Sequence, residues 1–281
     1  MLDTQDRSTL VKVSELTHYL LCPRLVYFNA QGKQQPAHVQ KNDRSAIEHA
    51  LFKELGFSWQ KLCLGDQENV PKSRDRKPDE AIAQTLAEIT DDLELIYKNE
   101  LGSVSEDLLE RVKTDFVTLI STSEWLGRLQ SNDELALLER SFGFERERSV
   151  ISQRLGLVGS MDKLIRTGDE HIPCIIKTGR CPAYSVWKRD RMQLAAYALL
   201  LEDAYETTVQ RGFVEYIRAP EVRTAVIKRG DRALALQTVK RVKRVKNGLF
   251  PDKGEHAPCE HCAFAAQCET RRTLLSRLLM R

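Results

Sequence analysis

The sequence predicts an α/β fold in which a helix packs against a β-sheet. Residues 149–157, 161–165, 172–176 and 211–217 are rich in β-branched and apolar side chains, as expected of short strands, and residues 223–228 are a further candidate. A helix is expected over residues 185–204, between the third and fourth of these strands. Strands that are separated by a helix are typical of an α/β sheet with the helix on one face.

The residues before these strands are expected to be helical. Pro23 marks a bend or the first turn of a new helix, and residues 43–64 have apolar positions at helical spacing. Residues 65–140 begin with a polar, proline-containing loop and continue as a charged helical section that is broken near Gly102 and Gly127. We interpret residues 65–140 as a helical insertion that caps the α/β part.

Composition narrows the class of protein. The chain has 281 residues, of which 30% are charged and 42% hydrophobic, an ordinary composition for a soluble protein. It has no apolar run of the roughly 20 residues that a membrane span needs, and its first residues lack the pattern of a signal peptide. We therefore expect a cytoplasmic protein with no membrane partner. The net charge of +3 means that a nucleic-acid footprint must come from local clusters of basic residues.

Residues 159–197 are expected to direct polar side chains toward a common spot. Asp162 ends one apolar run, Lys177 ends another, and Gln193 and Tyr197 share a helix face because they are four residues apart. Many nucleases use a carboxylate beside a lysine on neighbouring strands to hold a divalent metal and to stabilise charge on phosphate. The alternative for Asp162 and Lys177 is a salt bridge between the two strands.

Three cysteines near the C-terminus have the spacing of metal ligands. Cys259 and Cys262 form a C-x2-C pair, and Cys268 follows. A tetrahedral zinc site or a cubic 4Fe–4S site needs a fourth ligand. His261 lies inside the tight turn, so Cys22 is the better candidate, and it would clip the N-terminus to the C-terminus. Spacing does not separate zinc from iron–sulfur, and unrelated buried cysteines are the alternative.

A basic segment follows the predicted strands. Residues 238–246 place valines at helical spacing, and five basic residues fill the other positions. This pattern fits a helix with a solvated charged face. It also fits a stripe that follows phosphates, because clustered lysine and arginine side chains bind nucleic-acid backbones independently of sequence. The proposed DNA contacts are Lys240, Arg241, Lys243 and Arg244.

Taken together, these motifs resemble those of a known family. Their order along the chain is Cys22-Pro23-Arg24, His49, Gly159-x-x-Asp162, Lys177-Thr178-Gly179, Gln193-x-x-x-Tyr197 and the cluster of Cys259, Cys262 and Cys268. In this order the chain resembles the RecB-like nucleases of the PD-(D/E)XK superfamily, and more narrowly the CRISPR-associated exonuclease family called Cas-four. The match covers nearly the whole chain and is weakest over about residues 65–140.

The resemblance implies an architecture and a function. It implies a single RecB-like nuclease domain over residues 1–281, with a restriction-endonuclease-like core, a mixed central sheet and the helical insertion. Residues 255–270 would form the cysteine cluster, which closes on Cys22 around a 4Fe–4S cluster. A Mg or Mn nuclease site would lie beside it. Such proteins trim single-stranded DNA ends and help the CRISPR integrase to choose and size new spacers, the step called adaptation.

The resemblance also implies residue roles. His49 and Asp162 match the family's metal ligands, and Lys177 matches its catalytic lysine. This lysine would stabilise the attacking water or the charge that develops on phosphorus. Gln193 and Tyr197 would position the DNA or the site itself.

One position departs from the family pattern. A metal-binding Glu is expected two residues before the lysine, where this chain has Ile175. Strand side chains alternate, so Ile175 and Lys177 face the same side. Mg and Mn prefer oxygen ligands, and a replacement carboxylate must come from elsewhere. Asp169 and Glu170 in the preceding hairpin, and Glu145 and Glu147 upstream, are available, but their spacing nominates none of them.

Two functions of different class follow. The first is a metal-dependent single-stranded DNA exonuclease with an iron–sulfur scaffold, which is favoured by the retained His49, Asp162, Lys177 and Gln193. The second is a nuclease-impaired DNA-binding subunit that assists the CRISPR integrase, which is favoured by Ile175. A third hypothesis is a zinc-stabilised, nuclease-like protein of general DNA repair.

Overall fold

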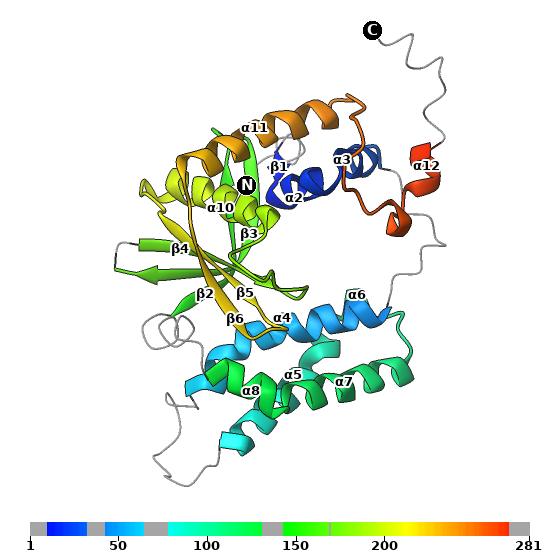
Figure 1. Ribbon diagram of the computed structural model, residues 1–281, viewed down its shortest axis with the longest axis vertical. Coiled ribbons are helices and arrows are strands. Elements are labelled where there is room, and N and C mark those ends of the chain that lie inside the picture. Colours follow the sequence, from blue (N-terminus) through cyan, green and yellow to red (C-terminus); the bar gives the residue numbers. More distant parts are fainter. Residues whose placement is uncertain (1–9, 33–42, 65–77, 131–142, 169, 270–281) are drawn as a thin grey trace.

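The computed structural model describes residues 10–32, 43–64, 78–130, 143–168 and 170–269, and it contains a six-stranded mixed sheet between two layers of helices (Figure 1). The strands are β1 Val11–Lys12, β2 Phe144–Ser152, β3 Leu157–Thr167, β4 Glu170–Lys177, β5 Arg211–Tyr216 and β6 Glu221–Val226. The helices are α2 Val13–Leu21, α3 Pro23–Ala30, α4 Asp43–Leu64, α5 Pro78–Ile96, α6 Lys98–Leu101, α7 Glu106–Ile120, α8 Ser123–Gln130, α10 Lys188–Tyr205, α11 Arg229–Lys246, the short 3-10 helix η1 Cys259–His261, and α12 Ala265–Glu269. In these ranges, no helix combines the length and the apolar character needed to cross a membrane.

The strand order explains why the sheet is mixed. The order is β1-β3-β4-β5-β6, and β2 also pairs with β3. Strands β2, β3 and β4 pair antiparallel, β4 and β5 pair parallel, and β5 and β6 pair antiparallel. Strand β1 also pairs parallel to β3. The parallel pair of β4 and β5 needs a crossover, and α10 provides it. The predicted α/β fold with a mixed sheet is confirmed.

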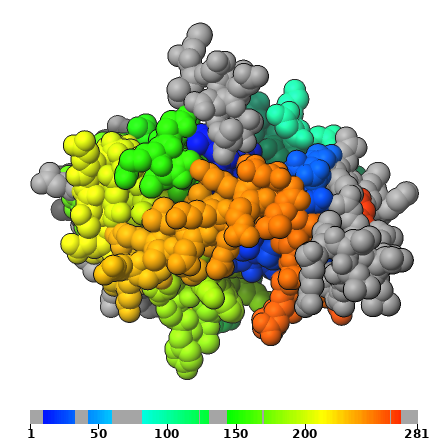
Figure 2. All heavy atoms as spheres, turned by 90° about the horizontal axis from the view of Figure 1, so that it is seen from above, coloured from blue at the N-terminus to red at the C-terminus, as the bar shows by residue number. Residues whose placement is uncertain are grey.

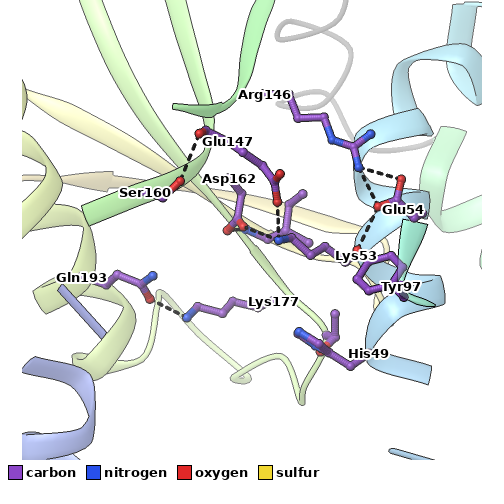
Figure 3. A network of polar contacts seen from close by, with 12 residues as sticks. His49, Lys53, Glu54, Tyr97, Arg146, Glu147, Ser160, Asp162, Lys177 and Gln193 are labelled. Carbon is purple, nitrogen blue, oxygen red and sulfur yellow. Dashed lines mark hydrogen bonds and ion pairs between the residues drawn. The ribbon is translucent and has the colours of Figure 1, made fainter. Parts of the chain in front are cut away.

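A separate hydrophobic core lies on each face of the sheet. The adjacent residues Ile175 and Ile176 of β4 belong to different cores, because successive strand side chains point to opposite faces. The core that contains Ile175 is shared with α2, α10 and α11, and the core that contains Ile176 is shared with α4, α5, α7 and α8. We call α4, α5, α7 and α8 the second layer of helices. The site described below lies where α4 of this layer meets the sheet (Figures 1 and 3).

The structure corrects the predicted strand boundaries. The predicted strand over residues 149–157 is confirmed only as far as Ser152, where β2 ends, because residues 153–156 turn into β3. Gly156 has a φ of +64°, a conformation that an L side chain rarely adopts, and it closes this turn. Helix α10 begins at Lys188 rather than at residue 185, where Ser185 has a φ of +55°.

The helical predictions hold with one exception. Pro23 begins α3, residues 43–64 form α4, and a break occurs at Gly102 as predicted. The predicted break at Gly127 is wrong, because α8 continues through it. A side chain at this glycine would meet open space, so no tertiary contact demands a turn there. Parts of the predicted loop and insertion, residues 65–77 and 131–142, lie outside the described residues.

A buried ion pair crosses the sheet beneath the second layer of helices. The Lys163 ammonium on β3 lies 2.8 Å from both carboxylate oxygens of Glu215 on β5. Their side chains are only 7% and 4% exposed. Cys174 of the intervening strand donates to Glu215 at 3.3 Å, and burial raises the pKa of its thiol well above the usual value. Removing one partner of such a pair leaves an uncompensated buried charge.

We predict that Glu215→Gln lowers the free energy of unfolding by about 3–5 kcal/mol, because the Lys163 ammonium loses its counter-charge in the interior. The double variant Lys163→Met/Glu215→Leu should recover most of this loss, since it removes both charges and keeps similar volumes. Urea unfolding followed by circular dichroism measures both effects. A double variant as unstable as the single variant would contradict the electrostatic explanation.

Candidate functional site

Two carboxylates lie side by side on the antiparallel pair β2 and β3. Glu147 of β2 and Asp162 of β3 face each other between the regular pairs Arg146–Lys163 and Arg148–Met161. Glu147 has a φ of +51°, which interrupts the regular ladder at this point. The Ser160 hydroxyl donates to the Glu147 carbonyl at 3.1 Å and holds the distorted backbone (Figure 3).

Asp162 also connects β3 to β4. One carboxylate oxygen accepts a hydrogen bond of 2.9 Å from the backbone N–H of Ile176. The last regular backbone pair between these strands is Lys163 with Cys174. Beyond it, the side chain of Asp162, rather than the backbone of β3, accepts the hydrogen bond from β4. This bond fixes the orientation of the carboxylate.

Lys53 of α4 bridges the two carboxylates. Its ammonium lies 2.8 Å from Glu147 and 3.7 Å from Asp162 (Figure 3). The hydrogen bond from Lys53 lowers the pKa of Glu147. The neighbouring residue Glu54 is buried and accepts hydrogen bonds from Arg146 at 2.6 and 2.8 Å, which fastens α4 to β2 beside the site. Adjacent residues of α4 therefore pair with adjacent residues of β2.

His49 lies one helical turn before Lys53 on the same face of α4. Its Nδ1 lies 2.8 Å from the hydroxyl of Thr178, the residue after Lys177. Burial lowers the pKa of His49 below its ordinary value of 6.5, and the positive charge of Lys53 lowers it further. The neutral imidazole is therefore favoured near neutral pH, and this is the form that coordinates metal ions.

Lys177 is held by helix α10. Its ammonium donates to Gln193 at 2.7 Å and forms an ion pair with Asp190 at 3.2 Å. Gln193 donates to the hydroxyl of Tyr197 at 3.3 Å, and that hydroxyl donates to the carbonyl of Ser160 at 2.6 Å. Burial raises the pKa of Tyr197. The ion-pair partner of Lys177 is thus Asp190. Gln193 and Tyr197, the predicted i, i+4 pair of α10, link this lysine to β3.

The structure places one of the candidate replacement carboxylates beside Asp162. Ile175 is fully buried in the core shared with α10, so hydrocarbon fills the position where the family pattern has a carboxylate. Of the four acidic residues considered from the sequence, Glu147 alone of those described lies beside Asp162. Glu145 and Glu170 are engaged by arginines, and Asp169 lies outside the described residues. The signal that could have identified Glu147 was the turn before Leu157, which sets the register of the hairpin.

The N-terminal and C-terminal cysteine segments lie against each other. Cys22 separates α2 from α3, Cys259 and Cys262 lie at η1, and Cys268 lies in α12. Arg24 of α3 donates to the Cys268 sulfur at 2.9 Å. A side chain at residue 254 would come within 3.3 Å of the Cys22 Cα, so the close approach of the two segments requires the glycine found there.

By residue type, the donors of this segment suit a metal cluster, although in the part of the chain that the structure describes no three of them lie close enough together to hold a metal ion. Four cysteines are the ligand set that both 4Fe–4S clusters and structural zinc accept. The buried Nη2 atom of Arg24, beside Cys268, has no hydrogen-bond partner in the structure. A buried donor of this kind is suited to sulfur atoms that carry negative charge.

The basic segment is an exposed amphipathic helix, α11, which crosses the face seen in Figure 2. Its valines, Val239, Val242 and Val245, are buried in the core that α11 shares with α2 and α10. Lys240, Arg241 and Arg244 are exposed, whereas Lys243 is half-buried against Gly156. The predicted helix is confirmed, and contact with DNA remains a prediction.

A model of the PD-(D/E)XK nuclease superfamily matches residues 12–269. The chain belongs to this superfamily. The match includes every candidate site residue named above, from Cys22 to Cys268. Nucleases of the PD-(D/E)XK superfamily generally use divalent metals.

Two curated proteins are similar to about half of this PD-(D/E)XK chain. A protein of Archaeoglobus fulgidus described as uncharacterized is 26% identical over 136 residues, 48% of this chain and 61% of the relative. A CRISPR-associated exonuclease Cas4/endonuclease Cas1 fusion of Leptospira interrogans is 28% identical over 149 residues, 50% of this chain and 28% of the relative. The chain therefore spans less than two thirds of either relative. The crystal structure of SSO0001 covers 78% of this chain and 97% of that one at 19% identity, with a TM-score of 0.34.

The donors at the PD-(D/E)XK site suit Mg or Mn by their chemistry. Glu147 and Asp162 supply carboxylate oxygens, and His49 supplies a neutral imidazole. In the described part of the chain, His, Cys, Asp and Glu side chains form no group of three that is close enough to hold a metal ion. The cation that the two carboxylates share is the ammonium of Lys53. A divalent ion at this position therefore competes with Lys53.

We predict that Lys53→Met increases the affinity for Mn by about tenfold, or about 1.4 kcal/mol, because it removes a positive charge from between the two carboxylates. Calorimetric titration of the protein with Mn measures the change. Lys113→Met is a matched control, since the Lys113 ammonium lies 2.9 Å from Glu94 and 3.0 Å from Glu110, in the helical layer. Equal gains in both variants would show that the effect is not specific to the candidate site.

Proposed function

We propose that this chain is a metal-dependent exonuclease that trims single-stranded DNA and processes the precursors of new CRISPR spacers. The observation that carries the proposal is the pairing of Glu147 with Asp162 on β2 and β3, beside strand β4, which ends at Lys177. Membership of the PD-(D/E)XK superfamily supports nuclease chemistry. The Leptospira relative, described as a CRISPR-associated exonuclease fused to the endonuclease Cas1, supports the CRISPR role and a partnership with the integrase.

In the proposed site, Glu147 takes the role of the carboxylate that is missing at Ile175. Glu147, Asp162 and His49 would hold Mg or Mn, which when bound activates water and polarises a phosphoryl oxygen. Lys177 stabilises the negative charge that develops on the phosphate. Gln193 holds the Lys177 ammonium by a direct hydrogen bond.

The nuclease proposal predicts a specific pattern of activity loss. With labelled single-stranded DNA and Mn, the natural sequence should cut, and Glu147→Gln and Lys177→Ala should each slow cutting by about 100-fold or more, because each removes a charge that acts in the transition state. Glu145→Gln is the matched control, since Glu145 lies on the same strand but pairs with Arg166 at 2.6 Å. It should cut at the natural rate. Normal cutting by Glu147→Gln would show that another group replaces the missing carboxylate.

The second candidate function is a nuclease-impaired subunit that holds DNA for the CRISPR integrase. It is favoured by the complete burial of Ile175 and by the Lys53 ammonium between the two carboxylates. The same assay separates the two functions. If the natural sequence binds DNA without cutting it and Ile175→Glu cuts, the chain is a binding subunit on a nuclease fold.

We also propose that Cys22, Cys259, Cys262 and Cys268 hold a 4Fe–4S cluster. Support comes from the ligand set, from the packing of α3 against the C-terminal segment, where Phe28 stacks on Phe264 with ring centroids 5.2 Å apart, and from the unsatisfied Arg24 nitrogen. A cluster bound by these residues would join the two ends of the chain covalently. In the same proposal, α11 follows the DNA backbone through Lys240, Arg241, Lys243 and Arg244.

We expect Cys22→Ser to lose most of its iron and visible absorbance and to unfold at lower temperature, because one ligand set holds both ends of the chain. Iron analysis and thermal unfolding of anaerobically purified protein measure these losses. Cys181→Ser is the control, since Cys181 lies in a different segment and donates to Glu221. A Cys22→Ser variant with full iron content and unchanged stability would exclude Cys22 as a ligand, and zinc in place of iron would favour the DNA-repair hypothesis.

A further inference from the structure

Residues 179–187, which connect β4 to α10, present two exposed aromatic side chains. We call this segment the aromatic loop. Tyr184 is 89% exposed and Trp187 is 47% exposed, whereas the other exposed large hydrophobic residues of the described ranges are aliphatic. Figure 2 shows the yellow-green part of the chain, to which this loop belongs, standing out from the surface. A large exposed apolar group is informative when it is not isolated.

Tyr184 has no role in holding the fold together. Within the described residues, its ring makes no hydrogen bond, ring stack or cation–π contact. An aromatic ring that is exposed in this way gains little from folding and is available for contacts outside the chain.

The backbone around Tyr184 is nevertheless held firmly. Ser185 adopts a left-handed φ of +55°, which a non-glycine residue keeps only when its surroundings fix it. Arg223 donates to the Ser185 carbonyl at 2.6 Å, and the indole N–H of Trp187 donates to the Arg180 carbonyl at 3.0 Å. The loop therefore presents its rings in a set conformation, which reduces the entropy lost on binding.

The charges around the loop favour a polyanion. Arg180, Lys188 and Arg189 are exposed beside the two aromatic residues. Asp190 is the one acidic residue of this stretch, and it is buried and paired with Lys177. Exposed rings among cations are the combination that binds single-stranded nucleic acid, in which bases stack on the rings and phosphates meet the cations.

A short chain of contacts joins the loop to the candidate catalytic lysine. The backbone N–H of Trp187 donates to the Tyr216 hydroxyl at 3.4 Å, and this hydroxyl donates to Asp190 at 2.8 Å. Asp190 in turn lies 3.2 Å from the Lys177 ammonium. The aromatic loop and Lys177 are therefore supported by the same buried residues.

We propose that Tyr184 and Trp187 form a stacking platform for the unpaired bases of single-stranded DNA and hold the strand beside Lys177. This inference rests on the proposed nuclease function and names the residues that would select an unpaired strand. A protein partner could also use exposed tyrosine and tryptophan side chains. The surrounding cations and the link to Lys177 favour DNA.

The first test measures binding of fluorescein-labelled oligothymidylate by anisotropy in EDTA, where a metal-dependent nuclease cannot cut. Tyr184→Ala should raise Kd at least about fivefold, the loss expected for one base–aromatic stack, whereas Tyr184→Phe should bind like the natural sequence. Leu95→Ala is the control, since Leu95 is 79% exposed on α5 of the opposite helical layer. It should leave Kd unchanged.

The second test separates bases from phosphates. An abasic strand of the same length carries the same phosphates but cannot stack, so it should bind more weakly, and Tyr184→Ala should not weaken it further. Replacing Lys240, Arg241 and Arg244 by alanine should flatten the salt dependence of Kd, and Tyr184→Ala should leave the salt dependence unchanged.

Tryptophan fluorescence provides a direct signature of stacking. The chain has three tryptophans, and Trp59 and Trp125 are buried whereas Trp187 is exposed. Oligothymidylate should therefore quench the fluorescence of Trp187, and Trp187→Phe should abolish this quenching. Blunt duplex DNA, whose bases are already stacked, should quench much less.

The outcomes separate this inference from the nuclease proposal. If Tyr184→Ala binds oligothymidylate like the natural sequence, or loses affinity equally for the abasic strand, the platform is refuted. If the natural sequence also cuts DNA, the nuclease proposal survives this failure. A loss of binding that is specific to bases, in a chain that does not cut, supports the platform and the binding-subunit function. A natural sequence that neither binds nor cuts single strands refutes both proposals.

Discussion

The site depends on one hydrogen bond, from the backbone N–H of Ile176 to the carboxylate of Asp162. Regular pairing of β3 with β4 ends at Lys163 and Cys174, yet β4 stays paired with β5 through Lys177. The carboxylate therefore bridges the opening between two strands that separate. It fixes where Lys177 leaves the sheet, and its second oxygen stays directed toward Lys53. Asp162, a proposed metal ligand, is thus held in place by its hydrogen bond to the backbone of β4.

In the proposed site, one carboxylate lies two strands away from its place in the family pattern, on β2 rather than on β4. Ile175 contributes hydrocarbon to a well-packed core, and a charged group there would be costly without partners. Glu147 lies on β2 opposite Asp162, where its left-handed backbone interrupts the ladder. The single positive charge of Lys53 lies between the two carboxylates and offsets part of their negative charge. In the proposed site, Glu147 supplies the second carboxylate, and the position of Ile175 belongs to the apolar core.

The sequence predicted the elements well and the contacts between them less well. Strand and helix types followed from local pattern, which is why β4, α4 and α11 were found. The turn at Gly156 was missed because the apolar residues around it have the pattern of one continuous strand. Without this turn, the sequence could not predict the hairpin register that sets Glu147 opposite Asp162. Lys53 could be found only through its position one turn after His49, since a salt bridge between distant segments leaves no local pattern.

The aromatic loop and Lys177, to which we assign substrate selection and catalysis in the proposals above, share one buried support. Tyr216, at the end of β5, contacts both the backbone of Trp187 and the carboxylate of Asp190. Asp190 in turn holds Lys177, so a shift of the aromatic loop would be transmitted to the lysine through two hydrogen bonds and one ion pair. Because burial raises the pKa of Tyr216, its hydroxyl stays protonated and donates to Asp190 across the physiological pH range. A strand that stacked on the loop would thus meet a lysine whose position is set by the same buried contacts.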